Sequence, residues 1–145
     1  MTRAKRLQPV QDLVDDTQRR LAASLATAER RLSESETKLQ ELERYRREYE
    51  QQFSQSAGRG IGAAALRDYQ AFLARLGEAI RQQDALVQRV RSDRDAERLR
   101  WQDAAKRARA LGHVVEQWQN EERRTADRRE QRETDERAQR KVTRP

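Results

Sequence analysis

The chain has 145 residues, of which 39% are charged and 34% hydrophobic, and its formal net charge is +7. This balance leaves too little apolar material for a layered globular core, and it favours long helices that each bury one stripe of side chains. The absence of cysteine excludes disulfides and thiolate metal sites.

The first predicted helix spans residues 8–56. Pro9 marks its start, since proline fits the first turn of a helix. Its apolar positions recur every three or four residues, the near-heptad spacing of a coiled coil, and this periodicity favours order over intrinsic disorder. The first stripe consists of Leu7, Val10, Val14, Thr17, Leu21, Leu25, Ala28, Leu32, Ser35, Leu39, Leu42, Tyr45, Tyr49 and Phe53.

A turn is predicted at residues 57–63, where Gly58, Gly60 and Gly62 give the backbone the freedom that a chain reversal needs. The second predicted helix spans residues 64–118 and carries a second stripe of the same spacing. This second stripe consists of Leu66, Tyr69, Leu73, Leu76, Ile80, Gln83, Val87, Val90, Arg94, Glu97, Trp101, Ala104, Ala108, Leu111, Val115 and Trp118.

Folding the chain back at residues 59–60 makes the two stripes face each other in a consistent register. The facing pairs are Phe53 with Leu66, Tyr49 with Tyr69, Leu42 with Leu76, Leu39 with Ile80 and Ser35 with Gln83. The last pair matches a polar gap in one stripe with a polar gap in the other. The match supports an antiparallel hairpin in which the second helix outlasts the first.

Residues 119–145 differ from the rest because they are almost entirely polar and charged. They form either a solvated single helix or a disordered tail that a partner could order. The predicted fold is therefore all-α: a long antiparallel two-helix coiled coil, or helical hairpin, with a C-terminal helical overhang, forming a single rod over residues 1–145.

The sequence offers no constellation of catalytic or cofactor-binding residues. His113 is the one histidine, which excludes a pair of histidine ligands. The glycines at 58–62 are followed by no Lys-Ser or Lys-Thr, so they predict a turn rather than a phosphate loop. The arginine pairs are interspersed with acidic residues, which favours a salt-bridged surface over a phosphate track. We therefore expect a non-enzyme without cofactor, metal or nucleic acid.

All five Tyr and Phe residues belong to the turn end of the predicted hairpin: Tyr45, Tyr49, Phe53, Tyr69 and Phe72. Two interpretations remain open. The rings fill the widening space where the helices separate, or two helices cannot cover five rings and the exposed part anchors a protein partner.

Three segments resemble the FliJ family of flagellar export proteins. They are KLQELERYRREYEQQF at residues 38–53, GRGI at residues 58–61 and LRDYQAFLARLGEAI at residues 66–80. TDERAQR at residues 134–140 is similar to the family's C-terminal element. Lys38 and Gln83 depart from the family pattern.

The resemblance implies a stalk-like component of the flagellar type III export apparatus. It implies binding to the hexameric export ATPase FliI through the free ends, with Asp135, Glu136 and Arg140 as candidate contacts. It also implies binding of the hairpin end to the cytoplasmic region of the export gate FlhA, and binding of export chaperones. The gate contacts carried over from the family are Leu42, Tyr45, Tyr49, Phe72, Leu76 and Ala79.

Two alternatives stay open: a stalk protein of an injectisome, and a plain coiled-coil tether or homodimer. The N-terminus lacks the apolar stretch of a secretion signal, and no later segment is apolar enough to span a bilayer. We therefore expect a cytoplasmic protein, peripherally associated with the export gate at the inner membrane.

Overall fold

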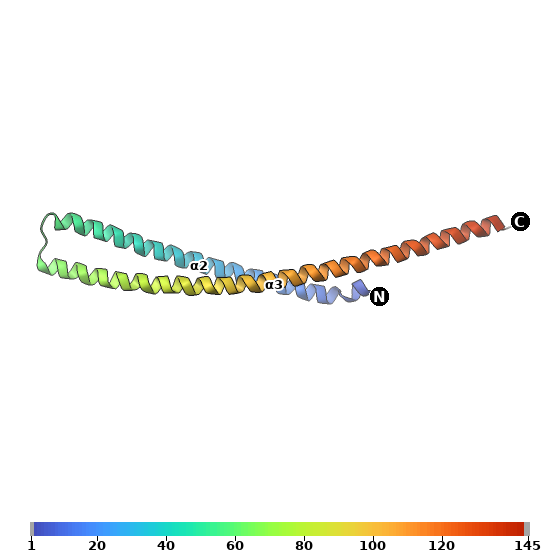
Figure 1. Ribbon diagram of the computed structural model, residues 1–145, viewed down its shortest axis with the longest axis horizontal. Helices are drawn as coiled ribbons and strands as arrows, with labels where there is room; N and C mark the ends of the chain where they lie inside the picture. Colours follow the sequence, from blue (N-terminus) through green and yellow to red (C-terminus); the bar gives the residue numbers. More distant parts are fainter. Residues whose placement is uncertain (1, 144–145) are drawn as a thin grey trace. The chain divides into compact units, whose positions relative to one another are not determined.

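The computed structural model describes residues 2–143, and helix is the state of nearly all of them (Figure 1). A short helix α1 (Arg3–Arg6) precedes α2 (Gln8–Ala57) and α3 (Ala63–Thr143). No strand occurs between residues 2 and 143. Helices α2 and α3 pack against each other in opposite directions, which confirms the predicted helical hairpin.

The turn between α2 and α3 depends on one glycine in a left-handed conformation. Gly60 has φ of +89°, which a residue with a side chain rarely adopts. Just before it, the amide of Arg59 donates to the Ser56 carbonyl at 3.0 Å, and the amide of Gly60 donates to the Ala57 carbonyl at 3.2 Å. These bonds satisfy carbonyl groups that the end of α2 leaves open.

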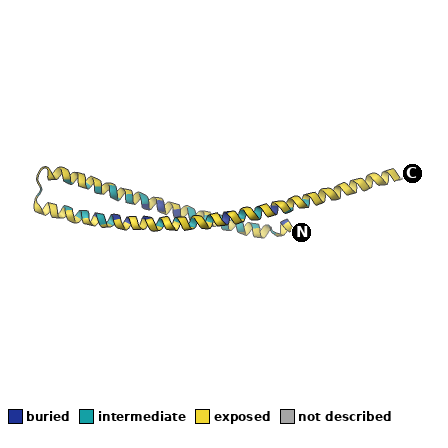
Figure 2. Cartoon of the chain, in the orientation of Figure 1, coloured by how far each residue is buried: buried dark blue, intermediate teal, exposed yellow. Residues whose placement is uncertain are grey.

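Contacts divide the chain into two compact units. The turn unit comprises Ala22–Arg100, and the terminal unit comprises Met1–Leu21 together with Trp101–Pro145. Buried residues lie along α2 and α3 as an interrupted stripe (Figure 2). The buried apolar residues of the turn unit are Ala28, Leu32, Leu76, Ile80 and Val87, and those of the terminal unit are Ala4, Ala104, Ala105 and Val115.

The register of the turn unit agrees with the facing polar pair expected from the sequence. Ser35 and Gln83 are each 7% exposed, and the Gln83 side-chain amide donates to the Ser35 main-chain carbonyl at 2.9 Å. Tyr49 stacks on Tyr69 as expected, with ring centroids 5.3 Å apart.

Phe53 makes a contact that was not among the expected pairs. Phe53 stacks on Tyr69, with ring centroids 3.5 Å apart, while Leu66 remains 40% exposed. Large aromatic rings carry much apolar surface and can reach a neighbour one turn away on the facing helix.

Two ion pairs join the helices beside the stripe in the turn unit. Arg91 contacts Glu36 at 3.2 Å, and Arg98 contacts Glu29 at 3.6 Å. All four side chains keep more than two fifths of their surface exposed, so each pair contributes about 0–1 kcal/mol. Pairs at such flanking positions select the orientation and the register of coiled coils.

In the terminal unit, α1 packs on α3. The Arg3 guanidinium contacts Glu121 at 2.8 Å and lies 4.6 Å from the centre of the Trp118 ring. The amide of Ala4 donates to the Glu122 carboxylate at 3.4 Å. Helix α1 was not expected from the sequence, because four residues are too few for a periodic pattern.

Beyond Glu122, α3 continues as a helix in which every described residue to Thr143 is exposed. Of the two states considered for this segment, the structure has the solvated helix. The exposed segment of α3 begins after Glu122 because α1 contacts α3 as far as that residue. In the part of the chain from Thr2 to Thr143, no helix contains an apolar stretch long enough to cross a bilayer.

Candidate functional site

Five aromatic rings meet near the turn and form what we call the aromatic cluster: Tyr45, Tyr49, Phe53, Tyr69 and Phe72. Phe72 lies across from two tyrosines of α2, with ring centroids 5.9 Å from Tyr45 and 4.3 Å from Tyr49. Tyr69 lies between Tyr49 and Phe53, stacked on both. The rings of α2 and α3 therefore alternate along the end of the hairpin.

The helices leave much of this cluster uncovered. Tyr45 is 49% exposed, and the other four rings are half-buried. A third element that packs against the cluster would bury the parts of the rings that the two helices leave exposed. Partly exposed tyrosine and phenylalanine are typical of the centre of protein interfaces.

The turn adds a groove to the cluster that sequence reasoning missed. Its volume is about 460 Å³, and Tyr49, Phe53 and Tyr69 form one wall. Ile61, which is half-buried between Gly60 and Gly62, forms another. The signal in the sequence is an apolar residue inside a glycine-rich turn, a pattern that predicts a reversal but not a groove.

The environment of Tyr69 keeps its hydroxyl neutral. Partial burial, and to a smaller extent the negative charge of Glu50, raises the pKa of Tyr69 above its ordinary value of 10.0. Tyr69 therefore presents an uncharged ring and hydroxyl group over the physiological pH range. Such a surface suits binding to a protein through apolar contact and a few hydrogen bonds.

The six residues carried over as gate contacts all lie in the turn unit, but they are not equally accessible. Tyr45 is exposed, and Leu42, Tyr49, Phe72 and Ala79 are half-buried. Leu76 is only 7% exposed, so it belongs mainly to the interface between the helices.

The three residues carried over as ATPase contacts lie in the other unit. Asp135, Glu136 and Arg140 are all exposed on the last part of α3. They lie within six residues of one another on a single helix, with no facing helix among the described residues. Their arrangement can form a charged binding surface.

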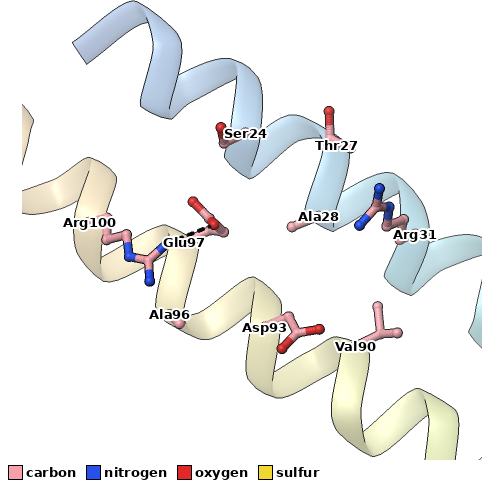
Figure 3. Close-up of a pocket in the computed structure, with 9 residues that line it drawn as sticks. All are labelled: Ser24, Thr27, Ala28, Arg31, Val90, Asp93, Ala96, Glu97 and Arg100. Carbon is pink, nitrogen blue, oxygen red and sulfur yellow. Dashed lines mark hydrogen bonds and ion pairs between the residues drawn. The ribbon is translucent and has the colours of Figure 1, made fainter. Parts of the chain in front are cut away.

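A second groove in the turn unit lies where polar residues interrupt the second stripe. It has a volume of about 450 Å³ between α2 and α3 (Figure 3). Glu97 is directed between the helices and contacts Arg100 at 3.1 Å. Arg31 and Asp93 add one charge of each sign to the lining. The groove has no excess charge and shows no preference for a ligand.

The chain was compared with protein families, curated proteins and solved structures. The family model described as "Flagellar FliJ protein" matches residues 3–145, nearly the whole chain. The searches of curated proteins and of solved structures gave no significant match. The chain therefore belongs to the FliJ family and is a component of the flagellar type III protein export apparatus.

Proposed function

We propose that the chain is a non-catalytic link in flagellar export, binding the hexameric ATPase FliI through its terminal unit and the cytoplasmic region of the gate protein FlhA through its turn unit. The proposal includes stimulation of the ATPase and binding of export chaperones. It also includes a cytoplasmic location at the membrane-embedded gate. Family membership supports the role in export, and the resemblance of the motifs supports these partners.

The aromatic cluster is the observation on which the proposed gate contact depends. Tyr45 is 49% exposed and lies beside Phe72, so the two rings offer apolar surface from both helices. Buried aromatic anchors at interfaces commonly contribute about 2 kcal/mol or more each. Leu76 is only 7% exposed, so we assign it an indirect role, through the packing of the two helices.

The test of the gate contact replaces Tyr45→Ala together with Tyr49→Ala. We expect helicity to remain largely intact, because both rings are partly exposed, and binding to purified FlhA cytoplasmic region to be lost in calorimetry. The matched control is Leu86→Ala with Leu99→Ala, which removes two exposed apolar side chains of the turn unit outside the cluster. If the tyrosine double mutant bound as tightly as the unmodified chain, the proposed contact would be contradicted.

The test of the ATPase contact deletes residues 123–145, which leaves the contacts of α1 with Glu121 and Glu122 in place. We expect stimulation of FliI turnover to end while the circular dichroism of the remaining helices persists. The fine test combines Asp135→Asn, Glu136→Gln and Arg140→Gln. Its control carries the same change of charge on the same helix: Asp127→Asn, Glu130→Gln and Arg132→Gln.

Stimulation that survives both the deletion and the triple replacement would contradict this assignment. A doubled mass in solution without any effect on the ATPase would instead indicate a coiled-coil tether. Stimulation of an injectisome ATPase but not of FliI would assign the chain to an injectisome, an outcome that the match to a flagellar family argues against.

A further inference from the structure

The terminal unit contains a groove between α2 and α3 that none of the proposed contacts uses. Its volume is about 510 Å³. It is lined by Gln18, Trp101, Gln102, Ala105, Lys106 and Arg109. Ala105 is buried, so its small side chain forms a floor between longer polar walls.

The lining of this groove has one electrostatic character. Five of its six side chains carry hydrogen-bond donors, two are cations, and none is a carboxylate. Neither Lys106 nor Arg109 forms an ion pair with any residue between 2 and 143, whereas the adjacent Arg107 pairs with Asp103 at 3.1 Å. Positive charge is therefore concentrated in the groove and neutralised beside it.

Trp101 forms part of the groove wall. Its indole N–H is buried and has no hydrogen-bond acceptor within the described part of the chain. A buried donor without an acceptor is unfavourable for the fold. The Trp101 side chain lines the groove, so its fluorescence reports on what binds there.

We propose that the groove binds a carboxylate side chain from an acidic segment of a partner protein. Lys106 and Arg109 supply the opposite charge, and the side-chain amides of Gln18 and Gln102 supply donors. A nucleic-acid phosphate has similar oxygens, but binding along a backbone requires a run of free cations. Here the neighbouring cations Arg20 and Arg107 are paired with Asp16 and Asp103.

The inference is independent of the proposed export partners, since its test uses none of them. The full-length chain carries Trp118→Phe, which leaves Trp101 as the single tryptophan and keeps an aromatic ring beside Arg3. The probe is a synthetic peptide of alternating glutamate and alanine. Its neutral counterpart alternates glutamine and alanine, and a thymidine oligonucleotide tests the phosphate alternative.

We expect the glutamate peptide to change the Trp101 emission saturably and the glutamine peptide to leave it unchanged. Lys106→Gln with Arg109→Gln should weaken binding of the glutamate peptide about tenfold. The control, Arg124→Gln with Arg128→Gln, removes the same charge from the exposed part of α3 and should leave the affinity within about twofold.

Three results would overturn the proposal. The first is an unchanged Trp101 emission at all concentrations of the glutamate peptide. The second is equal weakening by the two pairs of replacements, which indicates attraction by net charge alone. The third is an oligonucleotide that binds more tightly than the peptide and depends on Lys106 and Arg109.

Discussion

The hydrogen bond between Gln83 and Ser35 places a buried polar pair among apolar residues of the turn unit. Such a bond contributes about 1 kcal/mol net, whereas a buried amide without a partner costs about 1–3 kcal/mol. A shift by one heptad that moved Gln83 opposite Leu42 would lose the bond. The pair therefore selects the register more than it stabilises the hairpin.

Gln83→Leu should raise the free energy of unfolding by about 1 kcal/mol, because an apolar side chain of similar size then fills the site. Urea unfolding followed by circular dichroism measures this change. Spin labels on opposite helices should show a broader distance distribution in the variant, since the constraint on register is gone. A less stable variant with an unchanged distance distribution would mean that the polar pair acts mainly through its own bond energy.

The charge of Glu78 responds to a neighbour one turn away. Arg81 donates to the Glu78 carboxylate at 2.7 Å, and this bond lowers the pKa of Glu78 below its ordinary value of 4.5. Because the pKa of Glu78 is lowered in the folded state, the ion pair stabilises the fold above pH 4.5. This stabilisation is lost as the pH falls through the pKa that Glu78 has in the fold.

Arg81→Gln should therefore raise the pKa of Glu78, and a carboxyl titration by NMR would measure the change. An unchanged pKa would exclude Arg81 as the cause.

Among contacts between single residues, the sequence predicted those that depend only on the register of α2 against α3. The facing of Ser35 and Gln83 follows from helical spacing once the turn is placed. The stacking of Phe53 on Tyr69 and the unpaired indole of Trp101 could not be predicted, since both depend on side-chain rotation. The groove beside Trp101 was missed for the same reason.

Among the elements, the turn is where a single substitution is expected to be most informative. Gly60→Ala should lower the free energy of unfolding by about 1–2 kcal/mol, because a side chain at positive φ meets the following carbonyl. Gly62→Ala is the matched control: its φ lies outside the left-handed region, and an added Cβ meets nothing within 4 Å. Equal stability of the two variants in urea would show that the turn adapts without a glycine.

The helix boundaries show which sequence signals are sufficient to predict where a helix begins and ends. A helix was expected over residues 8–56 and extends over Gln8–Ala57, because proline and glycine mark both ends. Helix α1 depends instead on the Thr2 hydroxyl, which accepts from the Lys5 amide at 3.3 Å, and on contacts with α3 far away in the sequence. Such contacts produce no periodic pattern of residues in the sequence.

For the molecule as a whole, sequence and structure each identify part of the candidate site. Composition and periodicity predicted the hairpin and the gathering of all Tyr and Phe residues at its turn. The burial of Leu76 and the groove formed by Ile61 emerged only from the packing of the two helices. An apolar stripe shared by two helices cannot by itself indicate which of its members remain accessible to a partner.

Amide hydrogen exchange should vary along the whole chain according to how each part of α3 is covered. Residues 123–143 are helical but entirely exposed, so local fraying opens them, whereas the amides near Ile80 and Val87 open only when the helices separate. We expect exchange at least about tenfold faster beyond Glu122 than near Val87. Deleting residues 2–6 should extend the fast region back to Trp118, because α1 no longer covers it. Uniform protection to Thr143 would contradict this expectation, and protection that rises with protein concentration would mean that a second copy covers the exposed helix.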